Sequence, residues 1–177
     1  MTRYIAFLRA INVGGHVVKM DALRGLFESL GFSNVETFIA SGNVLFETNL
    51  NSNLEKKIES KLREALGYDV ATFIRTDAEL KAVANYKAFA QSQLEAATAF
   101  NVAFLKESLG DNSNQKVMSL RTDIDDFHVH GRELYWLCQK KQSESTFSNA
   151  VLEKTLGRPS TIRGVNTIQK IAAKYQK

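Results

Sequence analysis

The sequence predicts an α+β protein made of two successive βαββαβ units with antiparallel sheets. Three observations carry this prediction. Short β-rich runs and runs with helical periodicity alternate in the same order in both halves of the chain. Glycines and capping patterns separate these runs. Short strings of residues recur at corresponding places in the two halves. We expect a first unit with a following helix over residues 1–85, a linker over 86–99, and a second unit with a C-terminal helix over 100–177.

The first half begins with an apolar, β-rich run over residues 4–13, which predicts a strand that ends at the loop Gly14-Gly15. A helix follows, because apolar residues recur at helical spacing up to Gly31, a residue that favours the positive φ of a helix end. The apolar positions of this helix are Leu23, Leu26, Phe27 and Leu30.

Two further β-rich runs, residues 35–40 and 43–48, flank Ser41-Gly42 and predict a tight hairpin. Capping boxes at residues 52–55 and 76–79 predict two helix starts, and a strand over residues 70–75 lies between those helices. The resulting order is βαββαβ, the pattern of ferredoxin-like plaits. In that topology the antiparallel sheet has the strand order 4-1-3-2.

The second half repeats this order. We expect a strand over residues 100–105, a helix over 113–120, a hairpin around Gly131-Arg132, a helix that ends at Gly157, a short strand over 161–163 and a final helix. Residues 6–9, Ala-Phe-Leu-Arg, recur as residues 103–106, Ala-Phe-Leu-Lys, and Ile74-Arg75 recurs as Ile162-Arg163. Both matches fall at corresponding strands and favour an internal duplication.

The composition is that of an ordered globular protein, with 44% hydrophobic residues and a single proline among 177. No apolar run approaches the ~18 residues of a spanning helix, so we expect a soluble cytoplasmic protein with no membrane partner. Cys138 is the only cysteine, which excludes an intrachain disulfide, and its apolar surroundings predict a buried thiol. The formal net charge of +4 favours anionic partners.

Ferredoxin-like topology would bring the loop after the first strand and the first hairpin to the same end of the sheet. The candidate ligand residues at this end are Arg9, Asn12, Gly14, Gly15, Lys19, Ser41, Gly42 and Asn43. Glycine backbone N–H groups, the start of the following helix and two cationic side chains would suit a phosphate or a carboxylate. A plain loop that requires positive φ accounts for the glycines equally well.

The second half offers further candidates at its last helix. Arg163 ends a strand, and Asn166 and Lys170 follow it on the next turns, so these three could bind an anion or support the helix. For Arg75, at the corresponding place in the first half, we expect a structural role.

The second hairpin places His128, His130 and Glu133 on one face of the sheet. This pattern fits a metal or acid–base cluster, but also a polar, solvent-facing strand surface. No nucleophile setting or pair of carboxylates stands out, so neither catalytic residues nor a cofactor are assigned.

Two other functions remain open. One face of the first strand carries Ile5, Phe7 and Arg9, a mixture that can stack bases, which predicts single-stranded nucleic-acid binding. The same apolar face could instead pack against the other unit or a second copy of the chain. The protein would then be structural or homodimeric, with no ligand.

Residues 4–15, YIAFLRAINVGG, together with Lys19-Met20 and residues 41–44, SGNV, resemble a bacterial family known as domain of unknown function 1697. Residues 161–163, TIR, with Asn166 and Lys170, are similar to its C-terminal motif. The resemblance implies a small α/β protein with ferredoxin-like topology. It implies no activity and no cofactor.

Overall fold

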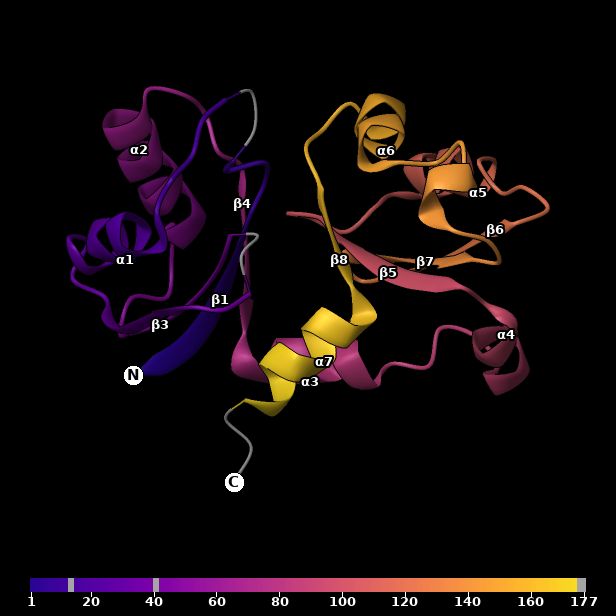
Figure 1. The fold of residues 1–177 in the computed structure, drawn as a ribbon, viewed down its shortest axis with the longest axis horizontal. Helices are drawn as coiled ribbons and strands as arrows, with labels where there is room; N and C mark the ends of the chain where they lie inside the picture. Colours follow the sequence, from indigo (N-terminus) through magenta and orange to yellow (C-terminus); the bar gives the residue numbers. More distant parts are fainter. Residues whose placement is uncertain (13–14, 40–41, 175–177) are drawn as a thin grey trace. The chain divides into compact units, whose positions relative to one another are not determined.

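The computed structural model describes residues 1–12, 15–39 and 42–174 (Figure 1). The chain forms two compact units, with the boundary between Ala82 and Val83. This boundary falls inside helix α3 (Asp77–Asn85), which the sequence assigned whole to the first unit. Within the described residues, no helix is both long and apolar enough to cross a membrane.

The first unit contains a four-stranded antiparallel sheet with the strand order β2-β3-β1-β4. Two helices connect its strands. In chain order the elements are β1 (Thr2–Leu8), α1 (Met20–Glu28), β2 (Ser33–Thr37), β3 (Asn43–Thr48), α2 (Leu54–Leu66) and β4 (Thr72–Thr76).

Both helices of the first unit cover the same face of the sheet (Figure 1). Alternate residues of β1 point to this face, as the period of two in a strand requires. On α2 the contacts come from residues four positions apart, which form one helical stripe. The core residues from these elements are Tyr4, Ala6, Leu8, Val44, Phe46 and Ile74 of the sheet, Leu23 and Phe27 of α1, and Leu54, Ile58 and Leu62 of α2.

The structure corrects three local predictions in this unit. Strand β1 ends at Leu8 instead of residue 13, because the backbone turns at Ala10 with a φ of 52°, and the apolar Ile11 is buried within the loop. The connection between β2 and β3 runs over residues 38–42 and is not a two-residue turn. The capping box at residues 52–55 does not form: Asn53 makes no side-chain cap, and Glu55 Oε1 accepts a hydrogen bond from the backbone N–H of Ile74.

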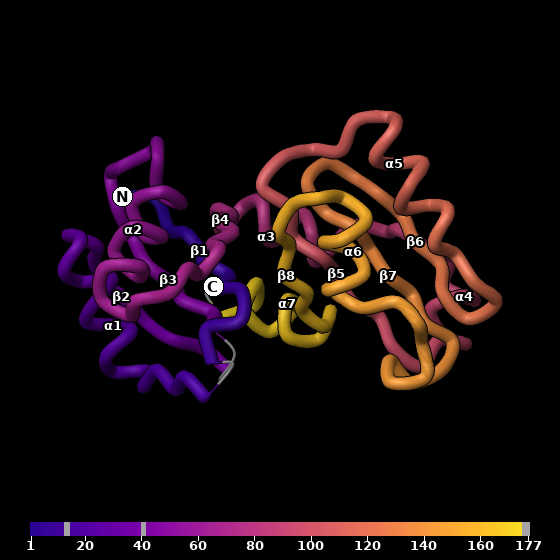
Figure 2. The backbone as a smooth tube through the Cα atoms, turned by 90° about the horizontal axis from the view of Figure 1, so that it is seen from above, coloured from indigo at the N-terminus to yellow at the C-terminus, as the bar shows by residue number. Residues whose placement is uncertain are grey.

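The second unit contains a second four-stranded antiparallel sheet, with the order β6-β7-β5-β8. Helices α5 and α6 lie together over one face of it (Figures 1 and 2). After α3, the elements are α4 (Gln91–Ala96), β5 (Ala99–Phe104), α5 (Asp111–Met118), β6 (Asp125–His130), β7 (Glu133–Cys138), the 3₁₀ turn η1 (Gln142–Glu144), α6 (Asn149–Leu156), β8 (Thr161–Gly164) and α7 (Val165–Ala173).

Trp136 and Cys138 of β7 lie in the core beneath these helices, together with Val117 of α5 and Leu152 of α6. The thiol of Cys138 is buried, as the sequence predicted, and burial raises its pKa. The two-residue turn between β6 and β7 at residues 131–132 is also confirmed.

The recurring strings occupy equivalent places in the two sheets. Ala6 pairs with Val44 on one side and Ile74 on the other, and Ala103 pairs with Leu134 and Ile162 in the same way. The chain therefore contains two antiparallel sheets with the same strand order and the same register of the matching residues.

Candidate functional site

A cavity of about 480 Å³ and one of about 210 Å³ each lie at the start of a helix. We name them after those helices. The smaller, the α1 cavity, lies in the first unit and is lined by Ile11, Asn12, Val18, Lys19, Met20, Leu23, Thr37, Ile39, Gly42 and Asn43. The larger, the α7 cavity, lies in the second unit and is lined by Leu94, Ala97, Thr98, Ala99, Phe100, Asn101, Gly164, Val165, Asn166 and Gln169.

The α1 cavity brings together four residues of the site predicted from the sequence: Asn12, Lys19, Gly42 and Asn43. They come from the loop after β1, the start of α1, the connection between β2 and β3, and the first position of β3. Sheet order explains the meeting, because β1 and β3 are antiparallel neighbours. The end of one and the start of the other therefore lie at the same edge.

Two asparagines of the α1 cavity shape its loops. The backbone N–H of Val18 donates to Asn12 Oδ1 at 2.8 Å, which ties the loop after β1 to the start of α1. Asn43 is buried, and its Nδ2 donates to the carbonyl oxygens of Phe38 and Ile39 at 3.1 and 3.3 Å. The Asn43 amide thus supports the connection and has no N–H left for a ligand.

Gly42 allows the loops to approach closely. Its φ is 75°, and a Cβ at this position would lie 3.0 Å from Ile11 Cγ2 and 3.1 Å from Leu8 Cβ. Any larger residue would combine an unfavourable backbone conformation with contacts against the cavity wall.

The start of α1 contributes positive charge to the α1 cavity. Lys19 is the N-cap residue of α1, and no side chain caps the helix. The first backbone N–H groups of a helix have no partner within it and carry partial positive charge. Asp21 is in the first turn but forms an ion pair with Arg24. The exposed Lys19 adds a full positive charge at the rim.

Two other predicted residues of the first half, Arg9 and Gly15, do not line the α1 cavity. Arg9 is half-buried, and its backbone N–H donates to the carbonyl oxygen of Ala71. Gly15 has a φ of 82°, as a loop glycine requires, but does not line the cavity. Gly14 and Ser41 lie outside the described residues.

Of the three candidates in the second half, Asn166 alone lines the α7 cavity. Arg163 is buried, and its Nη1 donates to Thr161 Oγ1 at 2.7 Å and to the carbonyl oxygen of Ile162 at 3.0 Å. Burial lowers the pKa of Arg163 to about 10. Arg75 is also buried and donates to the carbonyl oxygen of Ile74. Lys170 is exposed in the last turn of α7.

Sequence reasoning gave no role to Asn101, the most unusual residue of the α7 cavity. Its exposed fraction is only 6%, and its Nδ2 makes no hydrogen bond with any described residue. A signal was present, because Asn101 is the one polar residue in the apolar run over residues 100–105. A polar side chain at a strand position facing a core needs a partner or a function.

The His128 and His130 side chains share a face with Glu133, as the hairpin register predicted. Tyr86 packs on both imidazoles: its Oη lies 2.8 Å from His128 Nε2, and its ring stacks on His130 with centroids 4.0 Å apart. No group of three or more metal-ligating side chains occurs among residues 1–12, 15–39 and 42–174. Tyr86 therefore packs against part of this surface, so the surface does not face solvent along its whole length.

Three comparisons place the chain among known proteins. A solved structure, that of the conserved bacterial protein SP0830 from Streptococcus pneumoniae, is similar over 99% of both chains with 24% sequence identity and a TM-score of 0.80, which shows a shared fold. No curated protein matches the chain. The family model described as protein of unknown function (DUF1697) matches residues 1–135 of 177. The chain therefore belongs to this family of proteins of unknown function, DUF1697.

Proposed function

We propose that the protein binds a small anion, a phosphate or a carboxylate, in the α1 cavity. The observation that carries this proposal is the lining itself: Asn12, Lys19 and Gly42 meet at the uncapped start of α1, although they lie on three separate segments. No reaction is part of the proposal.

The donors in the α1 cavity favour an anionic ligand. The backbone N–H groups at the start of α1 point along the helix axis toward its N-terminal end, where partial positive charge gathers. Asn12 Oδ1 is used by Val18, which leaves the Asn12 Nδ2 as a donor near the rim. Lys19 supplies a mobile ammonium group.

The size of the cavity favours a small ligand. Its volume of about 210 Å³ is below the ~300–1,000 Å³ of pockets that hold drug-sized molecules. The remaining walls are apolar, with Ile11, Val18, Leu23 and Ile39 among them. An inorganic phosphate or the acid group of a short metabolite would fill this space.

We further propose that both units are ferredoxin-like plaits that arose by duplication. Support comes from the equal strand orders of the two sheets and from the equivalent register of Ala6 and Ala103. Under this proposal the two helix starts that follow the fourth strands, at residues 77 and 165, are equivalent positions.

Isothermal titration calorimetry of the full chain with inorganic phosphate and with acetate tests the binding proposal. Lys19→Met keeps the length of the side chain and removes its charge, and should weaken phosphate binding about fivefold. Lys57→Met is the matched control, because Lys57 is an exposed lysine of α2 that does not line the cavity. It should leave the affinity unchanged.

Two results would contradict the proposal. One is the absence of heat with either anion, and the other is an equal loss of affinity in both lysine variants, which would indicate a general charge effect. A single-stranded oligonucleotide that binds with steep salt dependence, and equally well to Lys19→Met, would instead favour the nucleic-acid alternative.

A further inference from the structure

The helix that follows the fourth strand starts at an equivalent place in each unit. Tyr4 pairs with Thr76 at the end of β4, and Asn101 pairs with Gly164 at the end of β8. The next residue begins a helix in both cases, α3 at Asp77 and α7 at Val165. The two helix starts can therefore be compared residue by residue.

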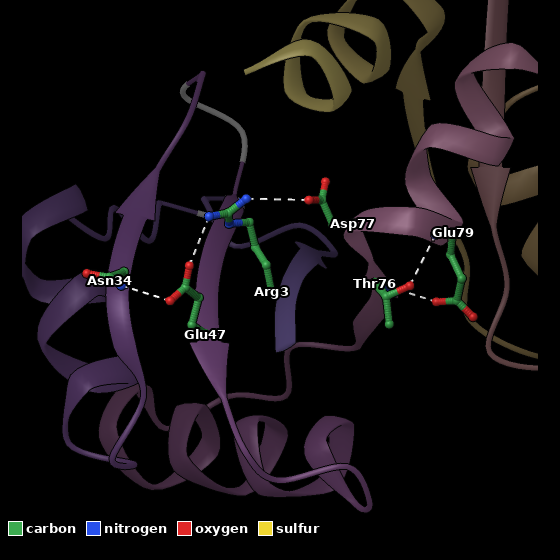
Figure 3. A network of polar contacts seen from close by, with 6 residues as sticks. All are labelled: Arg3, Asn34, Glu47, Thr76, Asp77 and Glu79. Carbon is green, nitrogen blue, oxygen red and sulfur yellow. Dashed lines mark hydrogen bonds and ion pairs between the residues drawn. The ribbon is translucent and has the colours of Figure 1, made fainter. Parts of the chain in front are cut away.

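At the start of α3, side chains of the same segment accept hydrogen bonds from the backbone N–H groups (Figure 3). The backbone N–H of Glu79 donates to Thr76 Oγ1 at 3.1 Å, and the backbone N–H of Thr76 donates to Glu79 Oε2 at 2.8 Å. These two bonds form a capping box. Asp77 adds an acidic group in the first turn, and Arg3 Nη1 lies 3.4 Å from Asp77 Oδ2.

The start of α7 lacks each of these features. Gly164 takes the place of Thr76 and supplies no side-chain cap, and the first turn contains no acidic residue. Val165 stands where α3 has Asp77. The helix has nine residues, and the free N–H groups of its first turn adjoin the α7 cavity, because Gly164, Val165 and Asn166 all line it.

Asn101 gives independent support for a ligand at this place. Asn101 is one of the residues that line the cavity, it is 94% buried, and its Nδ2 has no hydrogen-bond partner among the described residues. Natural proteins rarely leave a buried amide donor unpaired without a functional reason. Asn101 Oδ1 lies on the side of Gly164, which lines the cavity. Rotation by about 180° about the last side-chain torsion exchanges Nδ2 with Oδ1 and brings the donor to that side, and no hydrogen bond of Nδ2 opposes this rotation.

The rest of the lining identifies the class of ligand. Among the described residues, no charged side chain lines the α7 cavity, whereas the equivalent surface at the start of α3 includes Arg3, Glu47 and Lys81. Without a cation, a doubly charged phosphate would be poorly compensated, but a single carboxylate suits a helix start and an amide donor. The apolar walls come from Leu94, Ala97, Ala99, Phe100 and Val165.

We propose that the α7 cavity binds a small organic monocarboxylate. Its carboxylate accepts hydrogen bonds from the first-turn N–H groups of α7 and from Asn101, and its apolar body packs against Leu94 and Phe100. This site belongs to the second unit and is independent of the α1 cavity, so it goes beyond the function proposed above.

Amide ¹H–¹⁵N NMR of the full chain, titrated with acetate, butyrate, benzoate and inorganic phosphate, tests this proposal. Butyrate and benzoate should shift the backbone amides of Val165 and Asn166 and the side-chain amide of Asn101. Butyrate should bind more tightly than acetate because its methylene groups enter the apolar part of the cavity. Asn101→Val should weaken butyrate binding about tenfold, since a charge-assisted hydrogen bond is lost.

A second variant separates binding from folding. Asn166→Asp places a negative charge at the helix start, which favours the helix but repels a carboxylate. It should give a folded spectrum and abolish the butyrate shifts. Asn112→Asp makes the same charge change in the first turn of α5, outside the cavity, and should bind butyrate as the wild type does.

The proposal is overturned if butyrate and benzoate leave the amides at the start of α7 unmoved, if Asn166→Asp binds butyrate normally, or if phosphate binds there more tightly than butyrate. The backbone amides of Met20 and Asp21 report on the α1 cavity in the same spectra. Failure at α7 is thereby distinguished from failure of the first proposal.

Discussion

Replacing Asn101 by valine should make the second unit more stable, although most substitutions of buried residues destabilise a protein. In the ligand-free chain the buried Nδ2 has no partner among the described residues, so it carries a desolvation cost without a compensating hydrogen bond. Ligand binding by Asn101 would explain why the protein keeps an asparagine here despite this desolvation cost, since folding alone does not require one.

The magnitude follows from the structure. An unpaired buried donor costs about 1–3 kcal/mol, and valine also suits a strand better than asparagine does. The α7 cavity beside residue 101 gives the two methyl groups space, so overpacking is not expected. The free energy of unfolding of the second unit should rise by about 1–2 kcal/mol.

Trp136 provides the assay. It is the only tryptophan, its exposed fraction is 3%, and it lies in the core of the second unit. Urea denaturation followed by its fluorescence therefore reports the unfolding of this unit. A decrease in stability of about 1 kcal/mol or more on Asn101→Val, on the order of a lost hydrogen bond, would show that the buried Nδ2 carries no uncompensated desolvation cost.

A matched control is available in the first unit. Asn43 is also a buried strand asparagine, but its Nδ2 donates to two carbonyl oxygens, those of Phe38 and Ile39. Asn43→Val should lower the stability of the first unit by about 2 kcal/mol, measured by hydrogen exchange of the β3 amides. The change from asparagine to valine is thus expected to raise the free energy of unfolding at residue 101 and to lower it at residue 43.

Three more predictions concern polar and backbone features. Asp125→Ala should cost the second unit about 3 kcal/mol, measured by urea denaturation, because Trp136 Nε1 donates to this buried carboxylate at 2.9 Å and would lose its partner. Burial opposes ionisation of Asp125, but hydrogen bonds from Trp136 and two hydroxyl groups outweigh it and lower the pKa. Its contribution to stability should be complete above the ordinary aspartate pKa and disappear as the pH falls through the lowered value, which urea titrations at acid pH can check. Thr76→Ala removes the cap of α3 and should cost about 1 kcal/mol in thermal denaturation, whereas Thr76→Ser should not. Gly42→Ala should cost about 1–3 kcal/mol, because of its φ of 75° and the approach to Ile11, and should weaken phosphate binding in calorimetry.

Element type and order could be predicted from the sequence because strand and helix periodicities differ. Strand β3 over Asn43–Thr48, the turn at residues 131–132 and the capping box at Thr76 were all predicted correctly. Element ends were harder to predict. The apolar run after Leu8 was assigned to a strand, but Ile11 is buried in a loop, and hydrophobicity does not distinguish the two.

The two cavities differ in how far the sequence could reveal them. The meeting of Asn12, Lys19, Gly42 and Asn43 follows from the expected strand order, so topology alone predicted it. The evidence for a site at the α7 cavity is the missing hydrogen-bond partner of Asn101 Nδ2, and a missing partner is visible only in the three-dimensional structure.

Arg163 is a residue whose role the sequence does not decide. Its type and its place before a helix left a ligand role and a supporting role both open. In the structure it is buried, and its Nη1 donates to Thr161 and Ile162. Burial and hydrogen-bond partners bear on the choice between these roles, and neither can be read from residue type.

The most direct test of the central claim, that the α1 cavity is an anion site, is a crystal structure of the full chain soaked in inorganic phosphate. We expect density for a tetrahedral anion at the start of α1, with its oxygens about 3 Å from the backbone N–H groups of Met20 and Asp21 and from Lys19 Nζ. A well-ordered α1 cavity that contains only water under these conditions, or that is filled by a side chain of the protein, would contradict it.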